Sequence, residues 1–202
     1  MMTVAQPHQT LFGKVVNLVP LTVNHAADLL PHALEPVIWQ YMPYGNVDTL
    51  DKLRAVILDL LVRQAQGTDL CYTVWHLATD QPIGFTRFIA IDRTNESLEI
   101  GGTWYGAEFR RTSVNTESKL LLLMFAFDSL GCRRVQIQTD VRNEASQRAI
   151  ERLGAVREGI LRKNKLMPDG YERSSVMYSI INDDWPAIKK RITRLLSPVP
   201  NK

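Results

Sequence analysis

The chain has 202 residues, of which 45% are hydrophobic and 22% are charged, with a formal net charge of +3. This is an ordinary globular composition, and the length suits one domain with a substantial core. The small positive charge gives no support for nucleic acid or an anionic membrane as a partner. The longest apolar run, residues 120–127, is far shorter than the ~20 residues that a membrane span needs.

Two cysteines, Cys71 and Cys132, imply no disulfide framework, and the four histidines show no metal-ligand grouping. We therefore expect a soluble, cytoplasmic protein with no metal site. Residues 1–10 are polar and are expected to form a flexible N-terminus. Residues 11–196 are expected to form one domain, followed by a C-terminal tail over 197–202.

The first half of the chain predicts one strand, two helices and then three strands. Pro31 should kink or shorten the first helix, and Asp48 or Thr49 can cap the second. An aromatic loop over 39–45 separates the two helices. The predicted elements are a strand over 12–20, helices over 24–34 and 49–67, and strands over 70–77, 83–91 and 97–104.

The second half predicts two further helices between strands, a hairpin and a last helix. The helix over 116–130 is apolar almost all round and should be buried, and Gly131 ends it. Pro168-Asp169-Gly170 is a strong hairpin turn signal. The remaining elements are a strand over 134–139, a helix over 143–153, strands over 156–166 and 174–181, and a helix opened by Asp183 or Asp184. The order is βααβββαβαββα, a mixed α/β (α+β) domain.

Two strand-to-helix junctions carry the chemical signal of the sequence. In the first, Arg110 and Arg111 precede small hydroxyl residues and a helix N-terminus, which together form a plausible anion cradle. The second, over 140–147, repeats a strand end, a polar cap and a helix. Two such junctions on neighbouring parallel strands predict a cleft for a long phosphorylated ligand.

This element order and these junctions resemble the GNAT superfamily of acetyl-CoA-dependent N-acetyltransferases, and more closely its branch of ribosomal-protein N-terminal acetyltransferases. The matching segments cover nearly the whole chain in the right order: residues 99–101, 110–122, 126–131, 139–140, 143–155, 158–159 and 178–180. The resemblance implies a single domain built on a central, mixed, mostly antiparallel twisted sheet of about seven strands flanked by helices. It also implies acetyl-CoA as co-substrate.

In that family a loop of pattern Gln/Arg-x-x-Gly-x-Gly/Ala wraps the coenzyme A pyrophosphate with backbone amides. Here Arg110 holds the first position, while Ser113 and Asn115 replace the glycines. Asparagine tolerates the left-handed geometry that glycine allows. The implied cofactor-binding residues are Trp104 on the preceding strand, Arg110, Arg111, Thr112, Ser113, Val114, Asn115 and Thr116 in the loop, and Asn143 and Ser146 along the pantetheine arm.

The family's general-acid tyrosine falls at Ile150, seven residues after Asn143. Isoleucine cannot protonate a thiolate, so Ser146, another hydroxyl or water must serve. Coenzyme A is a comparatively good leaving group, with a thiol pKa of ~8.5 by analogy with cysteine. Acetyl transfer can therefore proceed without a dedicated general acid.

Glu99 is the best candidate for the base that deprotonates the acceptor. Strand alternation places it on one face with Gly101 and Thr103, opposite Ile100 and Trp104. Backbone N–H groups of the same strand are the expected oxyanion donors. The competing interpretation is a surface or salt-bridged glutamate. An α-amino group, with a pKa of about 8, needs less help than a lysine side chain at about 10.4.

Trp39, Tyr41 and Tyr44 are expected to wall the acceptor pocket, as the equivalent loop does in similar enzymes. The alternative is that they are core or hinge aromatics covering the sheet edge. Peptide N-termini, polyamines, aminoglycosides and amino acids all remain open as acceptors, because selectivity lies in such loops.

The sequence therefore predicts direct transfer of an acetyl group to a primary amine, on a protein N-terminus or a small molecule, by a protein that forms homodimers if it follows its family. The alternative function is a non-catalytic acyl-CoA-binding module. Ile150 favours that alternative, whereas Glu99, Asn143 and the loop over 110–116 favour the enzyme. We expect neither a membrane nor a nucleic acid as a partner.

Overall fold

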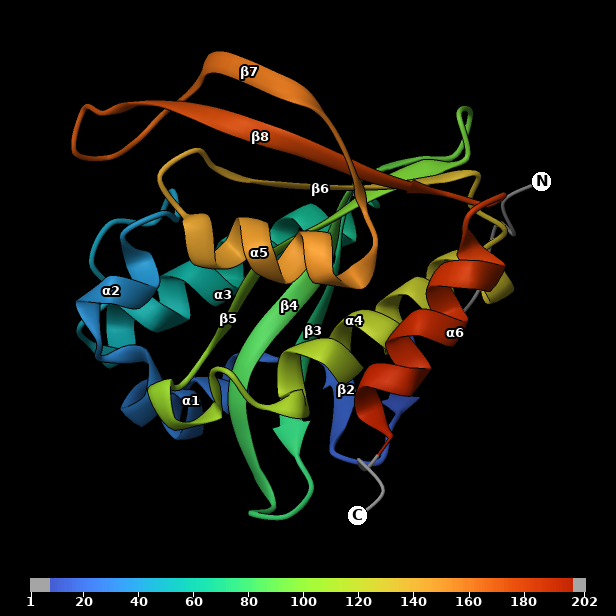
Figure 1. Ribbon diagram of the computed structural model, residues 1–202. Coiled ribbons are helices and arrows are strands. Elements are labelled where there is room, and N and C mark those ends of the chain that lie inside the picture. Colours follow the sequence, from blue (N-terminus) through green and yellow to red (C-terminus); the bar gives the residue numbers. More distant parts are fainter. Residues whose placement is uncertain (1–7, 198–202) are drawn as a thin grey trace.

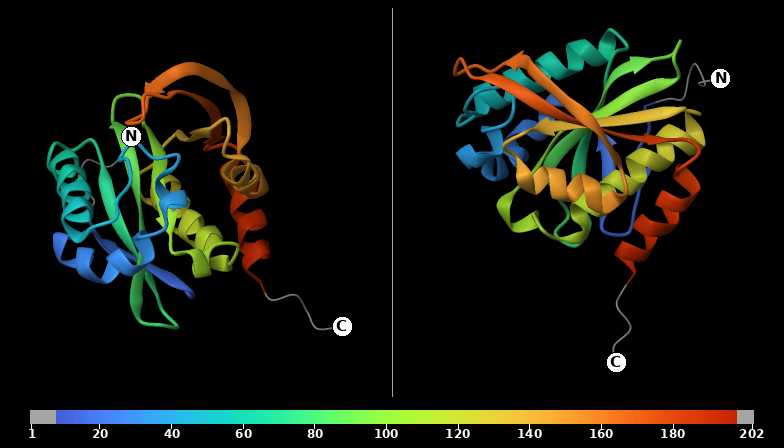
Figure 2. Two further views of the ribbon diagram at one scale, coloured as in Figure 1. Left: turned by 90° about the vertical axis from the view of Figure 1, so that its left-hand side faces the viewer. Right: turned by 45° about the horizontal axis from the view of Figure 1, so that its top comes forward.

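The computed structural model describes residues 8–197, so the predictions for residues 1–7 and 198–202 lie outside the described residues. One eight-stranded sheet of order β1-β2-β3-β4-β5-β6-β8-β7 forms its centre (Figure 1). Neighbouring strands are antiparallel, except that β5 and β6 are parallel. Helices α1 and α3 cover one face of the sheet, and α4 and α6 cover the other (Figure 2).

The bounds of the elements follow the predicted order closely. The strands are β1 (Leu11–Phe12), β2 (Val16–Pro20), β3 (Leu70–His76), β4 (Gln81–Asp92), β5 (Ser97–Tyr105), β6 (Arg134–Asp140), β7 (Val156–Leu166) and β8 (Glu172–Ile181). The helices are η1 (Val23–His25), α1 (Ala26–Ala33), α2 (Pro36–Trp39), α3 (Leu50–Ala65), η2 (Ala107–Phe109), α4 (Ser113–Met124), η3 (Phe125–Ser129), α5 (Glu144–Leu153) and α6 (Trp185–Leu196).

Three predictions in the first part of the chain need correction. The single strand predicted over 12–20 is two strands, β1 and β2, which raises the count from about seven to eight. The helix predicted over 24–34 begins with a 3-10 turn and continues as α1 through Pro31. A short helix that was not predicted, α2, precedes the aromatic loop and includes only its first residue, Trp39, because Pro36 in the first turn is pre-set for helix entry.

Helix α4 begins at Ser113 rather than at Thr116, and this moves the candidate anion cradle into its first turn. Thr112 is the N-cap, and its Oγ1 accepts a hydrogen bond from the backbone N–H of Val114 at 3.3 Å. The predicted C-terminal part of this helix is the π-helix η3, which ends at Ser129, just before Gly131.

A β-bulge in β5 changes which face its side chains occupy. Phe85 pairs with Trp104, but Arg87 pairs with Gly101, so β5 carries one extra residue opposite Thr86. Gly102 supplies the bulge with a φ of +58°, and a Cβ there would lie 2.8 Å from Nε of Arg87.

Because of this bulge, the predicted alternation along β5 is wrong beyond Gly101. Thr103 lies on the face of α4, where its hydroxyl accepts a hydrogen bond from Lys119, rather than on the face of Glu99. Ile100 packs in the cluster that includes α4 and α6, whereas Trp104 packs with α1 and α3 on the opposite face.

Among the described helices, none combines the length and apolarity needed to cross a bilayer.

The parallel pair β5 and β6 separates partway along its length. Its paired residues are Ser97 with Arg134, Leu98 with Val135, and Glu99 with Gln136. Beyond Glu99, β5 continues to Tyr105 and β6 to Asp140 with no pairing between them in the part of the chain that is described. The sheet therefore opens in its middle, and one backbone edge of each strand faces the opening.

Glu117 fastens α4 to the N-terminal strands. Its buried carboxylate accepts backbone hydrogen bonds from Lys14, Val15 and Val16 at 2.9, 2.6 and 2.8 Å. Three amides on one carboxylate satisfy the turn between β1 and β2, and they fix the position of the helix whose N-terminus faces the opening.

We predict that Glu117→Gln lowers the free energy of unfolding by at least about 2 kcal/mol, because an amide nitrogen cannot accept these hydrogen bonds and charge-assisted bonds contribute ~1.5–3 kcal/mol each. Denaturant unfolding measures the change. Glu172→Gln, on an exposed carboxylate paired with Lys163, is the control and should cost less than about 1 kcal/mol. Equal effects of the two substitutions would contradict the assigned role of Glu117.

Lys119 is buried in the second turn of α4, and no acidic side chain in residues 8–197 pairs with it. Its Nζ donates a hydrogen bond to Oγ1 of Thr103 at 2.7 Å, and that hydroxyl also contacts Oγ1 of Thr86 at 2.7 Å. Burial lowers the pKa of Lys119 from 10.5 to about 7. Above about pH 7 the unfolded chain therefore holds a proton that the folded protein lacks, so this residue destabilises the fold less as the pH rises.

We predict that Lys119→Met is more stable than the wild-type protein near pH 6.5, and that the difference shrinks toward pH 8.5 by up to about 1.4 kcal/mol per pH unit. Unfolding by denaturant at several pH values measures this difference, and effects of other titrating groups cancel between the two proteins. A difference that stays constant over this range would show that Lys119 keeps its ordinary pKa.

Candidate functional site

The opening between β5 and β6 is a cleft of about 640 Å³. Its walls are the separated strands, the first turns of α4 and α5, the aromatic segment after α2, and the hairpin β7–β8. The two junctions found in the sequence thus lie on neighbouring parallel strands, as predicted. Residues far apart in the chain meet here because the sheet parts at its middle.

At one end of the cleft lies the first turn of α4. The opening N–H groups of an α-helix have no carbonyl partner within the helix, and the helix dipole makes this end positive. Ser113 and Asn115 lie in this turn with helical geometry, so glycine is not needed at either position. The residue in left-handed geometry is Arg111, with a φ of +60°.

Arg110 and Arg111 give this end of the cleft its positive charge. Arg110 lines the cleft, donates from Nε to the carbonyl of Tyr105 at 3.2 Å, and pairs with Glu35 at 3.2 Å. Arg111 is exposed. Asn115 lines the cleft and accepts a hydrogen bond from the hydroxyl of Tyr105 at 3.3 Å.

Three other predicted loop residues use their side chains within the fold. Thr112 donates to the carbonyl of Phe109 at 2.7 Å and caps α4, and Val114 is buried in the core. Oγ1 of Thr116 accepts a hydrogen bond from Arg152 at 2.7 Å, which ties α4 to α5. Their contribution to a ligand would come from backbone groups rather than from side chains.

The start of α5 forms the opposite wall. Asn143 is the N-cap, as predicted, and its Oδ1 accepts a hydrogen bond from the backbone N–H of Ser146 at 3.0 Å. Both side chains line the cleft. Ile150 lies one turn further along, also in the cleft wall, so an apolar side chain stands where the resemblance places a tyrosine.

Glu99 lies where the strands separate, and it is 4% exposed. Its Oε2 accepts hydrogen bonds from Nε2 of Gln138 at 2.7 Å and of Gln136 at 3.2 Å. Neutral amide donors hold the carboxylate in place, and it is in no ion pair within the described residues, so the interpretation of Glu99 as an exposed or salt-bridged glutamate is wrong. It lines the cleft.

The predicted aromatic residues occupy two different environments. Tyr41 and Tyr44 line the cleft, and the hydroxyl of Tyr44 accepts a hydrogen bond from Arg87 at 3.0 Å. Trp39 is 3% exposed, donates to the carbonyl of Ala33 at 2.7 Å, and packs against Trp104 outside the cleft lining. Trp104 is buried there too, while its strand edge faces the cleft.

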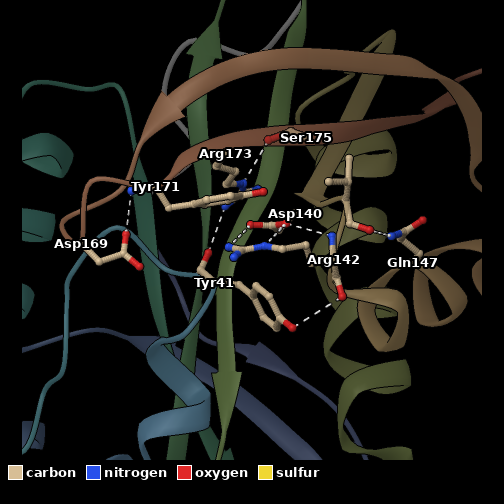
Figure 3. A network of polar contacts seen from close by, with 9 residues as sticks. Tyr41, Asp140, Arg142, Gln147, Asp169, Tyr171, Arg173 and Ser175 are labelled. Atoms are coloured by element: carbon tan, nitrogen blue, oxygen red, sulfur yellow. Dashed lines mark hydrogen bonds and ion pairs between the residues drawn. The ribbon is translucent and has the colours of Figure 1, made fainter.

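A polar network joins the aromatic segment to the hairpin (Figure 3). The Arg142 guanidinium lies between the rings of Tyr171 and Tyr41, at 3.5 and 5.6 Å from their centroids, and pairs with the buried Asp140 at 2.9 Å. Arg173 donates to the carbonyl of Tyr41 at 3.0 Å. This network fixes the cleft wall near Glu99, which is formed by the aromatic segment and the hairpin.

Several cleft residues were missed from the sequence: Lys119, Gln138, Arg142, Lys165 and Arg173. Lys119 carried a usable signal, because it is a basic residue in a helix that was predicted to be buried. The pair Gly101-Gly102 inside a strand signalled the bulge. In the described part of the chain, no three or more His, Cys, Asp or Glu side chains are grouped to hold a metal ion.

Comparison with known proteins identifies the family. The model of the acetyltransferase (GNAT) domain matches residues 16–156. YdaF of Bacillus subtilis (strain 168), named as a ribosomal N-acetyltransferase, is 33% identical over 99 residues, which are 49% of this chain and 53% of that protein. The chain therefore matches only about half the length of that relative. The N-acetyltransferase YjcK of the same organism is 25% identical over 86% of this chain and 98% of its own.

Solved structures agree with this assignment over almost the whole chain. A T. thermophilus protein assigned as an acetyltransferase superposes with a TM-score of 0.87 at 36% identity, covering 96% of this chain and 100% of that one. A GCN5-related N-acetyltransferase from Brucella melitensis gives a TM-score of 0.88 at 25% identity, over 96% and 87%. The fold, the parted strands and the matched residues together show that the chain belongs to the GNAT acetyltransferase family.

Proposed function

We propose that this protein transfers an acetyl group from acetyl-CoA directly to a primary amine, on a protein N-terminus or a small molecule. The observation that carries the proposal is a buried carboxylate outside any ion pair of the described residues, Glu99, placed where the two strands separate and beside an unpaired strand edge. The GNAT family uses acetyl-CoA, and a structural neighbour, the microcin C7 self-immunity acetyltransferase MccE, is known in complex with acetyl-CoA and AMP.

The cleft fits acetyl-CoA along its length. The pyrophosphate would bind the first-turn amides of α4, with Arg110 and Arg111 supplying positive charge. The pantetheine arm would follow the unpaired edges of β5 and β6, whose backbone groups need partners. Asn143 and Ser146 would contact that arm from α5.

At the centre of the cleft, Glu99 would accept the proton that the amine loses as it attacks the thioester carbonyl. Edge amides of β5 after Gly101 would stabilise the oxyanion that forms on the carbonyl oxygen. The carbon–sulfur bond then breaks, and the coenzyme A sulfur leaves as a thiolate.

The thiolate would be protonated by Ser146 or by water, because Ile150 has no proton to give. The same isoleucine is the observation that favours the rival function, a non-catalytic acyl-CoA-binding module. Glu99 argues against a binding module, since binding alone does not require a buried carboxylate where the amine would attack the thioester.

We predict one-to-one binding of acetyl-CoA in the micromolar range, measured by calorimetry, and about tenfold weaker binding by Arg111→Ala, which corresponds to ~1.4 kcal/mol. Arg111 is exposed, so its loss should leave the fold intact. Arg157→Ala, an exposed arginine of β7 outside the cleft lining, is the matched control and should bind like the wild type. Undetectable binding of acetyl-CoA by the wild-type protein would contradict the assignment of the cleft as the acetyl-CoA site.

For catalysis, we predict that Glu99→Gln keeps acetyl-CoA affinity within about twofold but lowers kcat/KM for the amine by about 100-fold or more, the range of general-base catalysis. Thiol release measures the rate, and Glu144→Gln at the exposed cleft rim is the control. A binding module would show no thiol release by either protein, and unchanged turnover by Glu99→Gln would assign the base elsewhere.

A further inference from the structure

The hairpin side of the cleft holds an excess of positive charge. Four cationic side chains gather around Glu99 at this end, and all of them line the cleft: Arg87, Arg142, Lys165 and Arg173. Two of the four are neutralised by buried carboxylates. Arg87 pairs with Asp69 at 2.5 Å, and Arg142 pairs with Asp140 at 2.9 Å.

The other two have no ion-pair partner within the described residues. Arg173 is 6% exposed, and it donates only to neutral acceptors there: Oγ of Ser175 at 3.1 Å and the carbonyl of Tyr41 at 3.0 Å. Lys165 is half-buried and makes no side-chain hydrogen bond or ion pair in that part of the chain. Burial lowers the pKa of both groups, while the negative charge of Glu99, and for Arg173 also that of Asp140, acts in the opposite direction. With Asp69, three carboxylates therefore face the four cations, which leaves an excess of positive charge.

The two residues form one structure rather than two isolated charges. Lys165 and Arg173 are directly paired across β7 and β8, so both project from one place on the hairpin. Arg87 lies close by; its Nη1 pairs with Asp69, while its buried Nε has no hydrogen-bond partner within the described residues. Burying cations without partners costs free energy, and two such groups, Lys165 and Arg173, in one wall favour a ligand that supplies negative charge.

The phosphates of coenzyme A are not suitable partners for these residues. The anion cradle is the first turn of α4, and in Figure 1 the start of α4 lies below α5, while the β7–β8 hairpin lies above it. Arg110, at the cradle, is not among the charged groups that act on Lys165 or Arg173. Glu99 acts electrostatically on both Lys165 and Arg173, so an amine that gives its proton to Glu99 would lie near these two cations.

We propose that the acceptor of this enzyme is a primary amine that also carries a carboxylate or a phosphate, and that this anionic group binds between Lys165 and Arg173. The proposal rests on the acetyl transfer proposed above and specifies its substrate class. The same cations would help the chemistry, because a positive environment disfavours the ammonium form of the bound amine and so favours the neutral nucleophile.

The test compares acceptors that have or lack an anionic group: serine with serinamide, and phosphoethanolamine with ethanolamine. In at least one pair, kcat/KM measured by thiol release at constant ionic strength should be at least tenfold higher for the anionic acceptor. A difference in the serine pair would indicate a carboxylate as the preferred group, and a difference in the ethanolamine pair would indicate a phosphate. Lys165→Met should remove most of that preference, and Lys165→Arg should retain it. Lys163→Met, on an exposed lysine of the same hairpin paired with Glu172, is the control.

A second readout does not depend on turnover. Inorganic phosphate should raise the melting temperature of the acetyl-CoA-saturated protein saturably, at constant ionic strength, and Lys165→Met should lose this rise while Lys163→Met keeps it. Equal kcat/KM within both pairs, or absence of the phosphate effect, would overturn the anionic-acceptor proposal and leave acetyl transfer standing. If phosphate raises the melting temperature but no acceptor causes thiol release from acetyl-CoA, the anion site would be supported and acetyl transfer would be contradicted.

Discussion

The site depends on the end of hydrogen bonding between β5 and β6 at Glu99 and Gln136. Backbone N–H and C=O groups inside a protein need hydrogen-bond partners. Beyond Glu99 and Gln136, the facing edges of β5 and β6 do not bond to each other, so the sheet supplies no partner for these groups. The bulge at Gly102 bends β5 away at this point. The result is an extended row of donors and acceptors that suits a linear, amide-containing ligand, with a carboxylate at its inner end.

The helices make this opening directional. Helices α4 and α5 begin beside it, so the positive end of α4 marks where a phosphate would bind, and the cap of α5 faces the middle. Glu117 fixes α4 against the N-terminal strands, and Lys119 supports Thr103 just after the bulge. The polar network around Arg142 then closes the far end by joining the aromatic segment to the hairpin (Figure 3).

Most of the fold was predictable because periodicity and turn chemistry are local properties. Pro168-Asp169-Gly170 and the cap at Asn143 were predicted correctly for that reason. The errors came from long-range contacts: Glu117 splits the first strand by binding the backbone of the turn, and the register with β4 sets the bulge. In the site, Glu99 and the two junctions were found, but the cations of the hairpin were not, since no local pattern says which face of β7 and β8 meets the cleft.

The central claim is that acetyl-CoA binds between the parted strands and takes the place of the missing strand partner. Amide hydrogen exchange over residues 101–105, in the free and the acetyl-CoA-saturated protein, tests it most directly. We expect binding to slow exchange of these amides markedly, with the first turn of α4 protected as well, and with β3 unchanged. Binding that protected only other segments and left residues 101–105 exchanging as in the free protein would contradict this account.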